Sequence, residues 1–347
     1  MTKRWKDRPP GSNWGDFGPD DELGRLNLLT PKKVLEGIRE VREGRVFSLS
    51  LPLDYPGERK LNPRRFPPQL HPVLREGLPV RNFPMEIGFP ERTDVMNDEV
   101  MHLCSQYSTQ WDALCHAGSQ FDADGDGTPE FVYYNGFRAG EHVTGPVRYT
   151  PEGACEATGQ SVGADALGIE RMAETGVQGR GAMIDLHAHY GRERQMVGYD
   201  ELMEVCAKDG VTVEPGDMLC FHTGFAEMLL EMKKKPDEES LQNSCAVLDG
   251  RDERLLEWIT ACGAAVLIAD NYAVEAYPPR EGTGRCALLP LHEHCLFKLG
   301  IHLGELWCLG ELAAWLRANG RYRFLLTAPP LRMPGAAGSP TTPVATV

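Results

Sequence analysis

The polar and apolar positions near the start of the chain predict one helix. Thr30 followed by Pro31 is typical of a helix start, because threonine caps the first turn and proline fits its first position. Val34, Ile38 and Val41 then recur at helical spacing. This period predicts a helix with one buried, apolar side.

The next segment predicts a strand and then a long arm. Residues 46–51 alternate apolar and polar side chains, which is typical of a strand with one buried face. Residues 52–90 contain many prolines and few apolar repeats, so we expect a long ordered loop or arm. Such segments commonly cover a site or reach a neighbouring subunit.

The middle of the chain alternates helical and strand patterns. We expect an α/β domain with a central mixed sheet, because no low-complexity linker interrupts residues 96–327. The predicted parts are an N-terminal helix, strand and proline-rich arm over residues 1–95, a catalytic domain over 96–328 and a C-terminal extension over 329–347, lying on the surface or disordered. The helices are expected at residues 164–175, 200–208 and 251–262, and the strands at residues 182–186, 218–221 and 264–269.

Composition and charge narrow the function classes. The 347 residues are 41% hydrophobic and 25% charged, with a formal net charge of −14, which argues against nucleic acid as a partner because a phosphate backbone needs a basic face. The N-terminus lacks the apolar core of a signal peptide, and no stretch approaches the roughly 18 apolar residues of a membrane span. We therefore expect a cytoplasmic protein with no membrane partner. The ten cysteines lack C-x-x-C spacing, which disfavours disulfides and thiolate zinc sites.

Two polar clusters stand out among apolar neighbours. The first runs from Gln106 to His116 and contains Asp112, a carboxylate suited to binding a cation, while His116 could act as a general base. A capping aspartate and a hydrogen-bonded core histidine are the alternative. The second cluster, around His292 and His294, offers imidazoles on a helix, but this spacing turns the two rings to different faces. Solvated surface histidines are the alternative there.

A third group could also bind a ligand. On a strand, Asp185, His187 and His189 would share one face and could hold an ion; polar residues on a solvated sheet face are the alternative. Asp270 follows a buried strand, where α/β folds place residues that face ligands, although a turn explains it equally well. Tyr134 lies in an aromatic segment that either lines a pocket or packs in the core.

The segment from Gln106 to His116, together with the downstream cluster, resembles the cyclase family of metal-dependent hydrolases, which includes bacterial arylformamidases (kynurenine formamidases) and isatin hydrolases. The family signature is H-x-G-T-H-x-D-x-P-x-H, followed far downstream by a histidine and then an acidic residue. The resemblance implies that Asp112 is a metal ligand, that His116 is the catalytic acid/base, and that His292 and Glu305 are the downstream ligands. Similar flanking segments lie at residues 179–181, 215–217, 223–224 and 338–340.

The chain departs from this signature at two positions. Gln106 and Gln110 stand where the family has its first two metal-binding histidines. Amide oxygens can coordinate hard cations but bind zinc poorly, so we expect one divalent ion, with Mn²⁺ favoured over Zn²⁺. His187 or His189 could supply the missing imidazole.

The resemblance also implies a fold and a mechanism. The fold would be the swivelling β/β/α type, in a homo-oligomer, a dimer or tetramer, where the arm of one subunit closes the pocket of another. A metal held by Asp112, His292 and Glu305, with Gln110 and Gln106 as further ligands, would lower the pKa of a bound water. His116 would move the proton as this water attacks an amide or lactone carbonyl.

The substrate would be a small cyclic or aryl molecule. Trp111, Tyr134 and Asp270 are the candidate substrate-binding residues. Two alternatives stay open: a metal-free ligand-binding or vestigial member of the same fold, and a ring-closing or dehydrating enzyme that uses the same acid/base set.

Overall fold

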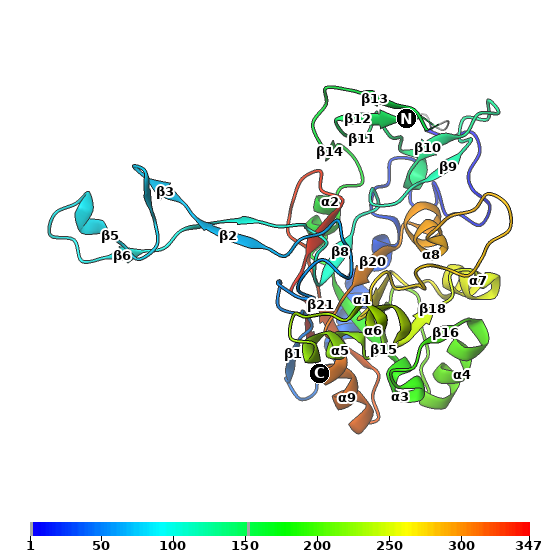
Figure 1. Ribbon diagram of the computed structural model, residues 1–347. Coiled ribbons are helices and arrows are strands. Elements are labelled where there is room, and N and C mark those ends of the chain that lie inside the picture. Colours follow the sequence, from blue (N-terminus) through cyan, green and yellow to red (C-terminus); the bar gives the residue numbers. More distant parts are fainter. Residues whose placement is uncertain (1–2, 151–152) are drawn as a thin grey trace.

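A nine-stranded mixed sheet forms the centre of the molecule in the computed structural model, which describes residues 3–150 and 153–347 (Figure 1). Four neighbouring strands run parallel and the others pair antiparallel. The predicted α/β class with a central mixed sheet is thereby confirmed. In spatial order the strands are β1 (Val46–Ser48), β23 (Val344–Thr346), β21 (Arg323–Thr327), β15 (Gln178–Asp185), β17 (Met218–His222), β19 (Val266–Ala269), β20 (His302–Glu305), β8 (Gln110–Asp112) and β22 (Gly338–Pro340).

The parallel strands β15, β17, β19 and β20 form the buried middle of the sheet. Each is nearly free of exposed side chains, as expected when both faces of a parallel sheet are covered. Their carboxyl ends lie at one edge, so residues that follow these strands come together there. The helices are α1 (Pro31–Arg39), α2 (Ile169–Glu174), α3 (Leu186–Tyr190), α4 (Tyr199–Asp209), α5 (Phe225–Glu231), α6 (Glu238–Asn243), α7 (Glu253–Cys262), α8 (Pro290–His292) with a π-helical continuation Glu293–Leu299, and α9 (Gly310–Ala318).

Most predicted elements are confirmed, with shifted ends. Helices α4 and α7 and strands β15, β17 and β19 occupy the expected segments, but α2 is shorter than the predicted helix at 164–175. All ten cysteines lie in the described part of the chain and are free thiols. No helix in the described ranges is long and apolar enough to cross a membrane.

Helix α1 buries a different side from the one that its apolar residues predicted. Thr30 caps the helix by accepting a hydrogen bond from the backbone of Lys33, as expected. However, Lys33 and Gly37 are buried while Ile38 is 47% exposed. Gly37 lies against the carbonyl of Gly179 on β15, where an added Cβ would be only 2.7 Å from that oxygen. Close backbone contact at glycine, and not an apolar stripe, therefore sets the orientation of this helix.

The proline-rich segment forms an arm that projects from the body (Figure 1). Its stem pairs β2 (Gln69–Pro72) with β7 (Glu99–His102). The predicted arm is confirmed, although it returns as far as His102. The outer part of the arm contains β3 (Leu74–Arg75), β4 (Leu78–Pro79), β5 (Phe83–Pro84) and β6 (Val95–Met96).

Four two-stranded sheets lie in the body of the molecule. They pair β9 (Ser119–Phe121) with β10 (Glu130–Val132), β11 (Val143–Thr144) with β14 (Gly163–Ala164), β12 (Val147–Tyr149) with β13 (Cys155–Ala157), and β16 (Gln195–Val197) with β18 (Ala246–Leu248).

The C-terminal segment is not the surface or disordered extension that its composition predicted. Its strands β22 and β23 belong to the central sheet, and Ser339, Ala345 and Val347 are fully buried. Pairing with strands from distant parts of the chain outweighs the local abundance of proline and glycine, because it satisfies the backbone groups of the tail.

Candidate metal centre

Strand β8 brings two polar side chains to one face of the sheet. Gln110 and Asp112 alternate with Trp111, so they point to the side opposite the indole. Both are fully buried. Gln110 pairs in register with Glu305 at the end of β20, and its Nε2 donates to Glu305 Oε2 at 3.1 Å. The strand pairing thus joins the two sequence clusters.

His292 completes this group from the end of α8. Pro290 starts that short helix, and the His292 ring reaches the sheet, with Nε2 3.3 Å from Glu305 Oε1 and 3.9 Å from Asp112 Oδ2. The Nε2 atom of His294 instead lies 2.9 Å from the hydroxyl of Thr260. The prediction that the two rings diverge is confirmed, but the solvated alternative is wrong, since both are buried.

Gln106 and His116 also lie beside Asp112. Gln106 Nε2 donates to Asp112 Oδ1 at 2.5 Å and lies 3.1 Å from His116 Nδ1. Asp112, His116 and His292 each offer one ligand atom, and these atoms lie within 4.8 Å of one another. Its amide nitrogen faces Asp112, so Gln106 is a hydrogen-bond donor in this structure, and its role as a metal ligand stays a prediction.

Glu275 is a residue of this centre that the sequence did not indicate. Its fully buried carboxylate lies 2.8 Å from His292 Nδ1 and accepts the backbone N–H groups of Leu291 at 3.0 Å and His292 at 2.9 Å. Ala273 and Val274, just before it, adopt left-handed backbone angles of φ 69° and 60°. Such strain costs about 1–3 kcal/mol per residue and is concentrated at functional sites. Glu275 thus holds the ring so that Nε2 faces Asp112 and Glu305.

The charges of the centre are strongly coupled. Burial disfavours a charged His292, yet the hydrogen bonds with Glu275 and Glu305 outweigh it and raise the pKa of His292 to about 10. Burial, together with the charge of Glu305, raises the pKa of Asp112. Burial also opposes the charge of Glu305, but the hydrogen bond with His292 lowers its pKa overall. A positive charge is therefore held between two carboxylates, and a cation could take the place of that proton.

The donor atoms of the centre fit a divalent metal ion. Two of its buried oxygens, Gln110 Oε1 and Asp112 Oδ2, have no hydrogen-bond partner within the described ranges. A buried polar atom without a partner costs about 1–3 kcal/mol, and coordination would remove that cost. Carboxylate and amide oxygens with imidazole nitrogen suit Mn²⁺, while Zn²⁺ would use mainly the imidazole and carboxylates.

The centre opens into a cavity of about 250 Å³. His116, His292 and Glu305 form its floor, and Asn62 and two arginines come from the base of the arm. This cavity adjoins a larger one of about 670 Å³, and the two share His292. The walls of the smaller cavity include Arg64, Arg65, Tyr272, Tyr277 and Leu288.

The three expected substrate-binding residues lie outside this cavity. Trp111 is buried in the core, where its Nε1 donates to the carbonyl of Ala328 at 2.8 Å. Tyr134 is also fully buried. Asp270 accepts the backbone N–H groups of Thr223 and Gly224 at 2.8 Å each, at the start of α5. The first two side chains pack in the core and the third caps a helix, so none of the three lines the cavity beside His292.

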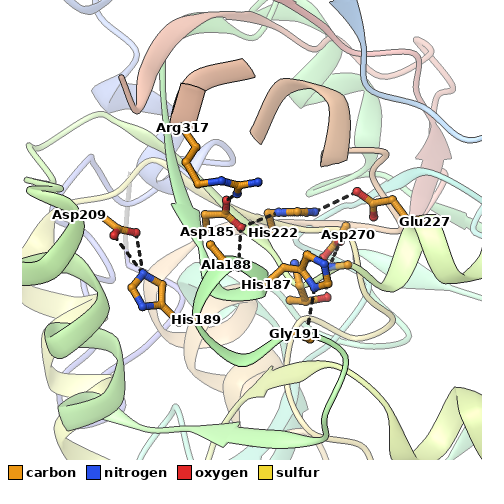
Figure 2. A network of polar contacts seen from close by, with 12 residues as sticks. Asp185, His187, Ala188, His189, Gly191, Asp209, His222, Glu227, Asp270 and Arg317 are labelled. Atoms are coloured by element: carbon orange, nitrogen blue, oxygen red, sulfur yellow. Dashed lines mark hydrogen bonds and ion pairs between the residues drawn. The ribbon is translucent and has the colours of Figure 1, made fainter. Parts of the chain in front are cut away.

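The histidines after β15 also belong to a different network, shown in Figure 2. The strand ends at Asp185 and α3 begins at once, so the predicted strand alternation is wrong. His187 Nδ1 lies 2.9 Å from the carbonyl of Gly191, and His189 Nε2 lies 3.0 Å from the carboxylate of Asp209. Neither ring supplies the missing imidazole of the metal centre.

His222 forms an ion-pair network with two carboxylates at the end of β15 and β17. His222 Nδ1 lies 2.7 Å from Asp185 Oδ1, and its Nε2 lies 2.9 Å from Glu227 Oε1 (Figure 2). Arg317 also donates to Asp185. Burial opposes the charged form of His222, but the hydrogen bonds with Asp185 and Glu227 raise its pKa to about 10. Both ring nitrogens of His222 therefore contact carboxylates.

The chain as a whole is similar to known proteins. The pattern of the family described as "Putative cyclase" matches residues 47–276. A solved structure described as a novel cyclase is 30% identical, with a TM-score of 0.73, and the match covers 97% of this chain and 99% of that one. No curated protein matches the sequence.

Two isatin hydrolase structures share the fold at low identity. Isatin hydrolase A from Labrenzia aggregata, bound to benzyl benzoate, is 13% identical with a TM-score of 0.53, covering 90% of this chain and 97% of that one. An isatin hydrolase bound to the product analogue thioisatinate is 14% identical with a TM-score of 0.52, covering 92% and 99%. The predicted fold of the cyclase type is confirmed.

Proposed function

Because the chain belongs to the cyclase family, we propose that it is a metal-dependent hydrolase that cleaves an amide or lactone bond of a small cyclic or aryl substrate. One observation carries this proposal: the buried side chains of Asp112, His292 and Glu305 converge with Gln110 at a cavity, where Asp112 Oδ2 and Gln110 Oε1 have no hydrogen-bond partner among the described residues. Isatin hydrolases of the same fold support the reaction class.

The residues that would hold the ion are Asp112, Glu305 and His292 through Nε2, with Gln110 through its unpartnered Oε1. A divalent ion there would lower the pKa of a bound water and polarise the carbonyl of the substrate. Glu275 fixes the orientation of His292, a role that carboxylates commonly have behind histidine ligands. We propose one ion per chain, with Mn²⁺ favoured by the oxygen-rich donor set.

His116 is the proposed proton carrier. It is partly exposed and lines the cavity. Gln106 lies 3.1 Å from its Nδ1, so Nε2 is the ring nitrogen that remains to exchange protons with bound molecules. A proton of the attacking water would reach the departing nitrogen or oxygen by way of this atom.

The test compares metal-free and metal-loaded protein on a panel of aryl formamides, cyclic imides and lactones. We expect hydrolysis of at least one class only after Mn²⁺ or Zn²⁺ is added. Equal rates with and without the ion contradict metal dependence, and saturable binding without turnover across the panel supports a ligand-binding role instead.

We also propose that the protein is a homo-oligomer, a dimer or tetramer, held together by the arm. Leu70 and Met101 face each other across β2 and β7 and are 66% and 46% exposed. Exposed apolar side chains on a projecting strand pair indicate a partner surface. Light scattering of the double variant Leu70→Lys/Met101→Lys should give a monomer; an unchanged mass contradicts this proposal.

A further inference from the structure

Two arginines of the cavity form no direct ion pair within the described part of the chain. Arg64 and Arg65 both line the cavity, and neither forms an ion pair with a carboxylate among residues 3–150 and 153–347, although Arg65 is close enough to Glu305 to help lower the pKa of that carboxyl group. The chain carries a net charge of −14, so acidic groups are abundant. A guanidinium without a direct ion pair among the described residues, at the wall of a small cavity, is placed to bind an anionic group of a ligand.

Arg65 is held in a fixed position. Its Nη1 donates to the backbone carbonyl of Gln106 at 2.5 Å, and Gln106 in turn bonds with Asp112. The arginine is therefore anchored to the metal centre while other guanidinium N–H groups stay available. A planar guanidinium can bind a carboxylate through two parallel hydrogen bonds.

The remaining walls are flat and largely apolar. The rings of Tyr272 and Tyr277 lie edge to face, with centroids 6.3 Å apart, and Leu288 lies beside them. Asn62 donates to the hydroxyl of Tyr272 at 3.1 Å, which leaves that hydroxyl free to donate. The volume of about 250 Å³ is below the roughly 300–1,000 Å³ of pockets for drug-sized ligands, so the cavity suits one ring or a fused pair.

We propose that the substrate of this site is an aryl or cyclic acid, and that Arg65 binds its carboxylate while the scissile bond faces His116 and Glu305. Arg64, more exposed at the mouth, adds positive charge that attracts the anion. This inference rests on the proposed hydrolase function and adds the charge of the substrate to it.

An alternative role for Arg65, in charge balance, predicts a different effect of its substitution. The guanidinium could serve only to offset the negative charge of Glu305. In that case its loss would weaken every substrate equally, because the defect would lie in the metal centre. A substrate-binding role predicts a loss confined to molecules with a carboxylate.

The experiment uses 2-formamidobenzoate and its methyl ester, which differ in one negative charge. For the metal-loaded wild type we expect the dissociation constant and KM to be about ten- to hundredfold lower for the acid, the scale of a hydrogen bond to a charged group. Arg65→Met should remove this preference by raising KM for the acid alone, with kcat and metal content preserved, and Arg65→Lys should restore part of it. Arg42→Met removes an arginine that is 67% exposed on the surface and should change neither value.

Two outcomes overturn the proposal. One is equal binding of acid and ester by the wild type, including failure of both to bind. The other is an equal loss for both in Arg65→Met, which assigns Arg65 to charge balance. Calorimetry measures binding separately from turnover, so preferential binding of the acid, with no hydrolysis of it or of any member of the panel, would refute the hydrolase function while supporting the carboxylate site.

Discussion

Glu275→Gln tests whether this carboxylate orients His292 as a metal ligand. The substitution keeps the shape of the side chain but replaces one acceptor oxygen by a donor. The wild-type carboxylate serves three N–H donors, at 2.8, 2.9 and 3.0 Å. A glutamine oxygen can still serve the two donors of His292, while the N–H of Leu291 then faces an amide nitrogen.

The expected loss of metal affinity and of stability in Glu275→Gln follows from these contacts. A hydrogen bond to a charged group contributes about 1.5–3 kcal/mol and a neutral one about 0.5–1.5 kcal/mol. The weaker hold on His292 should therefore cost about 1–1.5 kcal/mol, which is close to tenfold in metal affinity. Loss of a partner of this kind typically costs 10–100-fold. The N–H of Leu291, buried without an acceptor, should lower the free energy of unfolding by about 1–3 kcal/mol.

The assay is a competition titration of Mn²⁺ or Zn²⁺ against a chelating dye, with urea unfolding measured in parallel. Glu293→Gln is the matched control, because this carboxylate is adjacent in sequence but bonds with Ser119 and not with His292. It should leave the metal affinity unchanged. A metal dissociation constant of Glu275→Gln within about twofold of the wild type would refute the assigned role, since a tenfold change is expected.

Two further predictions concern proton transfer and pH. His116→Ala should lower turnover by about a hundredfold or more with the metal retained, whereas Asp112→Asn should lose both; full activity of the first variant, or equal loss of metal from both, contradicts the assignment. The pKa of His222 is raised to about 10 by Asp185 and Glu227, so its stabilisation is complete below the unfolded value of about 6.5 and lost as pH rises through about 10. Urea unfolding should show this alkaline loss in the wild type and a smaller one in His222→Gln; equal losses contradict the ion-pair network.

The residues of the candidate metal centre could be predicted only from the resemblance, because no pattern in the sequence predicted strand β8 or its pairing with β20. Gln110 and Asp112 share a face because a strand alternates, and the resemblance linked them with His292 and Glu305. Glu275 could not be found this way, because it reaches His292 through a strained turn that no periodicity marks.

Other predictions from the sequence failed because contacts between distant parts of the chain decide the structure there. Trp111 belongs to the same motif as Asp112, yet alternation turns it into the core, which the resemblance alone did not take into account. The tail after residue 328 has the composition of a loop, but its strands are stabilised by partners far away in sequence. Gly37 sets the packing of α1 by letting two backbones touch, a contact that hydrophobic spacing does not record.

Elemental analysis of the gently purified protein tests the central claim most directly. The account predicts one equivalent of a divalent ion per chain in the wild type, or its full recovery after Mn²⁺ or Zn²⁺ is added, and loss of that ion in Asp112→Asn. Metal content below about a tenth of an equivalent, unrestored by either ion, would contradict the account, because sites of this kind retain or readily regain their metal.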